Sequence, residues 1–198
     1  IPHGVDIFEE KFDQHYAKRK LNLERKKVLL FFGLVRPGKG IECLIEAMPS
    51  IVQQCSNATL MIVGTSHPYL ISPGKSYLKG VEELVHKLRL EDNVFFVNKF
   101  VPNRELPLYF IAADLIILPY TESDIIGASG ALSSIKSFKK PVIATRVRRF
   151  IGDITDGENG ILIPPSDSAS LARAATLLLS NAEIGRKLGV RLYNEAKD

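Results

Sequence analysis

The sequence predicts an α/β fold with an open, doubly wound and mostly parallel sheet. Strand-like and helix-like segments alternate about six times along the 198 residues, as a series of βαβ units requires. The strand-like runs are largely apolar, and the run at 28–32 is continuously so, which is typical of parallel strands covered on both faces. Glycine-bearing loops follow two of these runs. Because ligands bind beyond the carboxyl ends of such strands, we expect both loops to face one site.

The first half of the chain supplies three strands and the helices that connect them. Residues 1–6 are expected to form a short strand or loop, and the charged, aromatic stretch 8–23 to be irregular or weakly helical. Continuous apolar runs predict strands at 28–32, 59–63 and 94–97. Apolar side chains at helical spacing predict helices at 41–55, 77–88 and 104–112, the last with Asn103 as its N-cap.

The second half is organised around a crossover between strands at 114–118 and 141–145, which are joined by a polar loop and a helix at 130–138. A last strand is predicted at 160–163. It is followed by a helix at 169–179, capped by Ser168, and by a final helix at about 183–197.

The crossover helix would begin with the small residues Ser129, Gly130 and Ala131. The first amide groups of a helix have no partner inside it, and the helix dipole makes that end positive. An anion such as phosphate could therefore approach the backbone there. The alternative is that Ser129 is an ordinary N-cap beside a tight turn.

The composition is that of an ordinary globular domain with a mild basic excess. The chain is 45% hydrophobic and 24% charged, with a net charge of +4 and a pI of about 9.0. This excess suits phosphate-bearing ligands, and no tract of Lys and Arg indicates nucleic acid. The two cysteines, Cys43 and Cys55, favour a reduced setting over a disulfide framework. We expect a cytoplasmic protein, at most peripheral at the inner membrane face, with no metal and no cofactor.

The loop at 33–40 nearly spells a P-loop between a strand and a helix. Gly40 stands where a Ser or Thr hydroxyl would bind Mg²⁺, and Pro37 lacks an amide for a phosphate cradle. The loop therefore argues against an NTPase, and no G-x-G-x-x-G fingerprint supports NAD binding. Arg36 and Lys39 remain: they could neutralise a diphosphate, or they could be solvated loop charges.

Several stretches, in order and over nearly the whole chain, resemble the C-terminal, donor-nucleotide domain of a family-four retaining glycosyltransferase with the GT-B fold. They are the segments at 1–6 (I-P-H-G-V-D), 31–40, 101–115, 140–145 (K-P-V-I-A-T) and 156–160 (D-G-E-N-G). The resemblance implies a Rossmann-like domain that forms one half of a GT-B enzyme. Residues 1–198 would be this half, with 1–23 in the inter-domain linker region. The acceptor domain would precede it, because the chain begins without Met and looks cut at both ends.

The resemblance also implies three sets of site residues. The set for the donor diphosphate is Arg36, Lys39, Ser129, Gly130 and Ala131, with Lys39 matching the family lysine and Arg36 replacing the family arginine, whose position holds Leu34. The set for the nucleotide is Gly33, Lys99, Phe100, Val101 and Ser134. The catalytic residues are unknown, and Glu122 and Asp124 are the candidates for contact with the sugar.

The sequence departs from the family at its acidic Glu-x7-Glu pair. The two positions fall on Ile126 and Ser134, so that one hydroxyl would replace the glutamate that binds the ribose. The family's Gly-Gly before D-G-E-N-G is Arg148-Arg149 here. These arginines either contact an anionic acceptor or phosphate, or they are surface charges.

The expected function is retaining transfer of a sugar from a nucleotide-diphosphate sugar to a sugar or lipid-linked acceptor, without a metal. The expected partners are the donor, the N-terminal domain of the same protein and a membrane-surface or lipid-linked acceptor, with no nucleic acid. Alone, the fragment would be inactive. The alternatives are a non-catalytic relic that binds a nucleotide or a partner, and a GT-B nucleotide-sugar epimerase.

Overall fold

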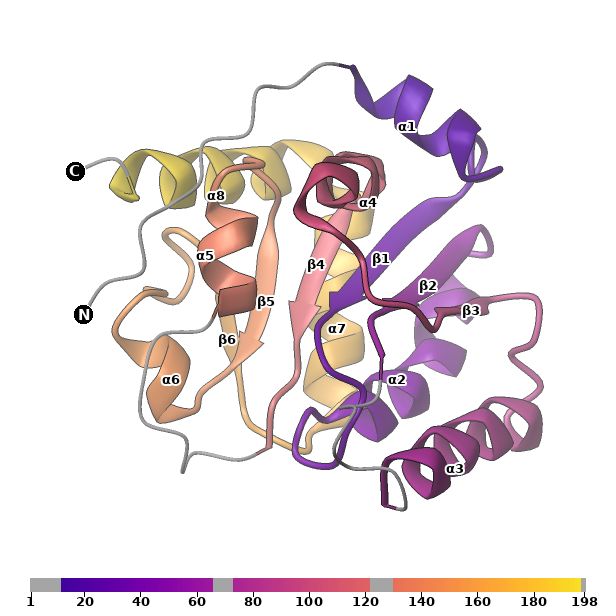
Figure 1. Ribbon diagram of the computed structural model, residues 1–198. Helices are drawn as coiled ribbons and strands as arrows, with labels where there is room; N and C mark the ends of the chain where they lie inside the picture. The colour runs from indigo at the N-terminus through magenta and orange to yellow at the C-terminus, as the bar shows by residue number, and fades with distance from the viewer. Residues whose placement is uncertain (1–11, 66–72, 122–129, 197–198) are drawn as a thin grey trace.

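The computed structural model describes residues 12–65, 73–121 and 130–196, and it has the predicted doubly wound α/β fold (Figure 1). In this part of the chain the sheet has six strands in the order β3-β2-β1-β4-β5-β6, and every neighbouring pair is parallel. The chain winds outward from β1 to β3 and then returns to β4 beside β1. The topological switch point, where such sheets bind ligands, therefore lies between β1 and β4.

All six predicted strands are confirmed, each within one residue at its start and with no change at its end. They are β1 (Lys27–Phe32), β2 (Ala58–Val63), β3 (Val94–Val97), β4 (Leu115–Leu118), β5 (Val142–Thr145) and β6 (Ile161–Ile163). Every residue of β2, β4 and β5 is buried, as their largely apolar sequences predict. The strand predictions succeed because helices cover both faces of the sheet.

The helices are α1 (Gln14–Lys20), α2 (Ile41–Gln54), α3 (Pro73–Lys87), α4 (Leu106–Ala112), α5 (Gly130–Lys136), α6 (Arg148–Ile151), α7 (Ser168–Ser180) and α8 (Ala182–Glu195), with a short 3-10 turn, η1 (Asn103–Glu105). Helices α2 and α7 pack together on one face of the sheet, and α4 and α5 lie over the other (Figure 1). None of the helices within the described ranges is long and apolar enough to cross a membrane.

Both predicted N-caps are wrong. Asn103 lies inside η1, and α4 begins three residues later at Leu106. Helix α7 is capped by Asp167, whose carboxylate accepts a hydrogen bond of 2.8 Å from the Ser170 amide, so that Ser168 is the first helical residue. A carboxylate reaches the open amides of a first turn as well as a hydroxyl does, and here it precedes the serine.

Two helices were not predicted as such. The stretch expected to be irregular or weakly helical contains α1, which is capped by Asp13 and buries Ala17 against the rest of the fold. Helix α6 has only four residues, too few to show a helical period, and Phe150 anchors it in the core. The spacing of apolar residues predicted neither helix, because each is too short to show a clear apolar stripe. Packing against the rest of the fold stabilises them instead.

The two cysteines are free thiols. Cys43 is buried in α2, and Cys55 ends that helix. Burial, together with the charge of Glu46, raises the pKa of the Cys43 thiol to about 11. Cys43 is therefore a core side chain that stays protonated at neutral pH.

Candidate functional site

The loop at 33–40 packs between the segments that follow β2 and β4, at the carboxyl edge of the sheet. A Cβ on Gly64 would lie 1.8 Å from the carbonyl oxygen of Gly33, and a Cβ on Gly40 would lie 1.8 Å from that of Pro119. Both Gly64 and Gly40 also have positive φ values, 146° and 67°. No other residue fits at position 40, so this departure from the P-loop pattern is a packing requirement of the fold.

Lys39 lies at the switch point, the place where sheets of this kind bind ligands in a crevice. The residue is only 8% exposed, and its Nζ lies 3.6 Å from the centroid of the Tyr120 ring. Tyr120 is itself 4% exposed and packs against Phe150 of α6, with 5.0 Å between ring centroids. The hydroxyl of Thr145 donates a 2.6 Å hydrogen bond to the Tyr120 carbonyl. The lysine ammonium is thus held on an aromatic face that is itself fixed from two sides.

Tyr120 is a site residue that sequence reasoning missed. It follows Pro119 directly after β4, and its hydroxyl lies 3.8 Å from the place where a Cβ on Gly33 would stand. An aromatic residue at the end of one central strand and a lysine after the other could have suggested the contact. The signal is weak, because only the neighbouring positions of β1 and β4 in the sheet bring the two side chains together.

Arg36, the second cation of the loop, lies toward different neighbours. Its Nη1 donates a 2.8 Å hydrogen bond to the Pro37 carbonyl. Arg36 is also close enough to Tyr77 of α3 for its charge to lower the pKa of that tyrosine. Burial and a 2.7 Å hydrogen bond to Glu42 act in the opposite direction, and together they raise the Tyr77 pKa above its ordinary value. Arg36 therefore lies on the side of α2 and α3, whereas Lys39 lies on the side of β4.

A cavity of about 190 Å³ opens where β1, β2 and β3 end. It is lined by Phe32, Gly33, Leu34, Gly64, Thr65, Lys99, Phe100 and Val101. Phe100 is 77% exposed, which is unusual for a large apolar side chain and leaves an aromatic face open to a ligand. The structure thus brings together Gly33, Lys99, Phe100 and Val101 of the predicted nucleotide set. Their roles remain predictions.

Lys99 is engaged at the rim of this cavity. Its Nζ lies 3.0 Å from a carboxylate oxygen of Glu105, and the hydrogen bond between them raises the pKa of the lysine. The salt bridge ties the segment after β3 to the η1 turn. The Lys99 charge is therefore partly neutralised by Glu105.

The rest of the predicted diphosphate and sugar sites is only partly described. Glu122, Asp124 and Ser129 lie outside the described residues. Gly130 begins α5 and is exposed, with open space where a Cβ would stand, and Ala131 is half-buried behind it. The Ser134 hydroxyl donates a 3.1 Å hydrogen bond to the Gly130 carbonyl, so it turns back onto its own helix.

The arginines after β5 lie at the same edge of the sheet as these loops. Arg146 pairs with Asp156 at 2.7 Å. Arg148 is exposed on α6, whereas Arg149 is half-buried and makes polar or electrostatic contacts of its own. Because Phe150 packs against Tyr120, α6 is joined through that ring to Lys39. Both interpretations of the Arg148-Arg149 pair remain open.

Sequence comparison matches residues 13–197 to the family described as glycosyl transferases group 1. The chain is 26% identical over 199 residues to the D-inositol 3-phosphate glycosyltransferase of Nocardia farcinica, covering 99% of this chain and 43% of that protein. It is 30% identical over 156 residues to the phosphatidyl-myo-inositol mannosyltransferase of Mycobacterium leprae, covering 78% of this chain and 38% of that protein. The chain spans less than half the length of these curated relatives.

Solved structures share the fold. HepE of Anabaena, in complex with UDP and glucose, has a TM-score of 0.85 at 22% identity, over 100% of this chain and 51% of HepE. Sucrose-phosphate synthase of Thermosynechococcus elongatus has a TM-score of 0.82 at 29% identity, over 100% and 47%. The C-terminal domain of the group 1 glycosyl transferase LpcC of Francisella tularensis has a TM-score of 0.82 at 22% identity, over 99% and 97%.

Proposed function

The chain belongs to the group 1 glycosyl transferase family, and from this we propose that it binds a nucleotide-diphosphate sugar as the donor for glycosyl transfer. One observation carries the proposal: an open aromatic face at a cavity and a lysine buried on an aromatic ring lie at the same edge of the sheet, beside and at its switch point. The sugar would pass, with retention of configuration, to a sugar or lipid-linked acceptor.

The cavity suits the base of the nucleotide. Bases stack on aromatic side chains, and Phe100 offers such a face beside the backbone of Lys99 and Val101. The loop glycine Gly33 leaves room for a planar ring to lie against the main chain. The nucleotide bound by HepE, which is UDP, is the first one to test.

The crevice suits the diphosphate. When the bond to the sugar breaks, negative charge grows on the leaving phosphate oxygens, and fixed positive charge nearby lowers the barrier. Lys39, held against Tyr120, would supply this charge without moving. Arg36 would bind from the other side of the loop, and the start of α5 at Gly130 and Ala131, with Ser129, would offer backbone amides. This mechanism needs no metal.

The acceptor site would come from another part of the protein. The chain spans less than half of its curated relatives, and it matches nearly all of an isolated C-terminal domain. We therefore place an acceptor-binding half before residue 1, with Glu122 and Asp124 as the candidates that reach the transferred sugar. The chain alone would bind donor weakly and transfer no sugar.

A second candidate is nucleotide binding without turnover, which the missing acidic pair favours, since Ile126 and Ser134 occupy its positions. The protein with its preceding half, a UDP- or GDP-sugar and a sugar or lipid acceptor separates the two. Nucleotide release above the hydrolysis background, with the new bond in the donor's anomeric configuration, supports the retaining enzyme. Tight donor binding with no release supports the second candidate.

Calorimetry of the chain with UDP- and GDP-sugars tests donor binding directly. We expect binding of at least one of them at low ionic strength, and we expect Phe100→Ala to weaken it about tenfold, because one stacked base is lost. Phe95→Ala is the matched control: Phe95 is also exposed, at 43%, but does not line the cavity. No binding at millimolar donor, or equal losses in both variants, would rule out the assigned base site.

A further inference from the structure

A second cavity lies at the opposite edge of the sheet, where the strands begin. It has a volume of about 280 Å³ and is lined by Gln14, Lys27, Ala113, Asp114, Lys139, Lys140, Pro141, Leu178, Leu179, Ala182, Gly185 and Arg186. Lys27 opens β1, Asp114 precedes β4 and Pro141 precedes β5. The six residues of β1 separate this cavity from the donor crevice by about 20 Å. The cavity therefore belongs to no part of the proposed donor site.

Four of the lining side chains are cationic: Lys27, Lys139, Lys140 and Arg186. They come from three places in the chain, namely the start of β1, the turn between α5 and β5, and the first turns of α8. Their convergence is thus a product of the tertiary structure and not of a basic run in the sequence. Like charges brought together around a hollow repel one another unless an anion lies between them.

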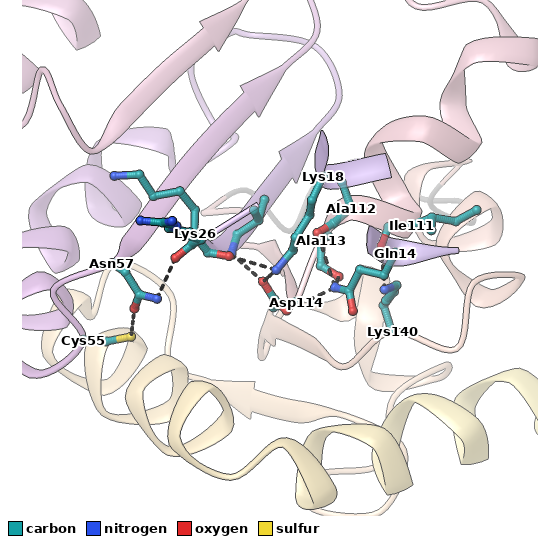
Figure 2. A network of polar contacts seen from close by, with 12 residues as sticks. Gln14, Lys18, Lys26, Cys55, Asn57, Ile111, Ala112, Ala113, Asp114 and Lys140 are labelled. Atoms are coloured by element: carbon teal, nitrogen blue, oxygen red, sulfur yellow. Dashed lines mark hydrogen bonds and ion pairs between the residues drawn. The ribbon is translucent and has the colours of Figure 1, made fainter. Parts of the chain in front are cut away.

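The acidic group at this cavity does not compensate the four cations. The Asp114 carboxylate accepts hydrogen bonds from the Lys18 ammonium at 2.6 Å, the Val28 amide at 2.7 Å and the Gln14 side chain at 3.1 Å (Figure 2). Its charge is already paired with Lys18, which is not among the lining residues. The lining therefore keeps an excess of positive charge.

Two of the cations are fixed, and two can turn to a ligand. Lys140 donates to the Ile111 carbonyl at 2.8 Å (Figure 2), and Lys139 lies over the Tyr193 ring at 4.7 Å. Within the part of the chain that the structure describes, the side chains of Lys27 and Arg186 make no hydrogen bond or ion pair. Arginine can grip two oxygens of one phosphate, whereas lysine acts as a point charge.

We propose that this cavity binds a phosphate-bearing anion, as a second anion site distinct from the donor crevice. Its size, at the lower end of ligand pockets, suits a phosphate group with a small attached moiety. The anion binds between Lys27 and Arg186, with Lys139 and Lys140 at its sides. A free phosphorylated molecule and the headgroup of an anionic phospholipid share this chemistry.

Titration of the full chain with inorganic phosphate, followed by amide NMR signals, tests the site without relying on donor binding. We expect saturable shifts at Ala113, Lys140 and Gly185, which lie around the cavity. The double variant Lys27→Gln with Arg186→Gln should weaken binding about tenfold or more, since it removes two charged donors. The matched control, Lys87→Gln with Arg89→Gln, removes the same charges from exposed positions at the end of α3 and should leave the affinity unchanged.

Vesicles distinguish the two sources of the phosphate. Co-sedimentation with phosphatidylglycerol vesicles, but not with phosphatidylcholine vesicles, that is lost in the Lys27 and Arg186 double variant assigns the site to lipid headgroups. Saturable binding of inorganic phosphate without vesicle binding assigns it to a soluble anion. Absence of both, or equal losses in the double variant and its control, overturns the proposal. None of these outcomes depends on whether the chain binds a nucleotide sugar.

Discussion

Two lysines at opposite edges of the sheet show how neighbours decide what a buried cation can do. The Lys18 side chain is 12% exposed and Lys39 is 8% exposed. Lys18 reaches the Asp114 carboxylate at 2.6 Å, and the two charges cancel. Lys39 lies on the ring of Tyr120, which positions the ammonium but carries no net charge. The first contact secures the fold, and the second fixes the ammonium where we propose a diphosphate binds.

The difference extends to the surroundings of each lysine. Around Asp114, hydrogen bonds join α1, the start of β1 and the end of α4, so that the amino edge is held together by a closed polar network (Figure 2). At the carboxyl edge, close backbone contacts of Gly33 with Gly64 and of Gly40 with Pro119 hold the loop that carries Lys39. The amino edge is thus held by hydrogen bonds between side chains and backbone, and the carboxyl edge by close packing of the backbone.

The largest expected effect is at the amino edge. Asp114→Ala should lower the free energy of unfolding by about 3–5 kcal/mol, because it leaves Lys18 without its counter-ion and the Val28 amide without an acceptor. Urea unfolding measures this change. Asp114→Asn, which keeps an acceptor but not the charge, should fall between wild type and alanine. A loss below about 1 kcal/mol would place Asp114 among the ordinary surface ion pairs and remove the contrast.

The next effect is on the donor side. Lys39→Met should weaken the binding of whichever UDP- or GDP-sugar binds by about ten- to a hundredfold, the value of one strong charged contact. Calorimetry measures it, with Lys79→Met on the surface of α3 as the control. The corresponding nucleoside, which has no phosphate, should lose little affinity. An equal loss for the nucleoside would mean that Lys39 supports the base site and not the diphosphate.

The smallest effect isolates the aromatic ring. Tyr120→Phe keeps the face under Lys39, and its donor affinity should stay within about twofold of wild type. Tyr120→Leu removes the face and should lower donor affinity about three- to tenfold. Calorimetry of both variants, alongside urea unfolding to correct for lost packing against Phe150, makes the comparison. Equal losses in both variants would show that the hydroxyl, close to Gly33, is the important group and that the ring is not.

The sequence alone was enough for the sheet and for the edge at which the two glycine-bearing loops lie. Apolar runs predicted all six strands, because burial on both faces leaves a signature in each segment independently of the others. The loops after β1 and β4 were placed at one edge for a similar reason, since parallel strands end on the same side. The motifs also indicated the family, and four of the predicted nucleotide residues line one cavity.

Only the tertiary structure decided which partner each polar side chain meets. Asp114 and Lys18 are 96 positions apart, and neither carries a local sign of the other. The divergence of Arg36 and Lys39, the ring under Lys39 and the four cations at the amino edge depend on contacts between distant segments. Periodicity reports how a segment is buried. The identity of its neighbour is set by strand order and helix packing, which bring residues together regardless of their separation in the chain.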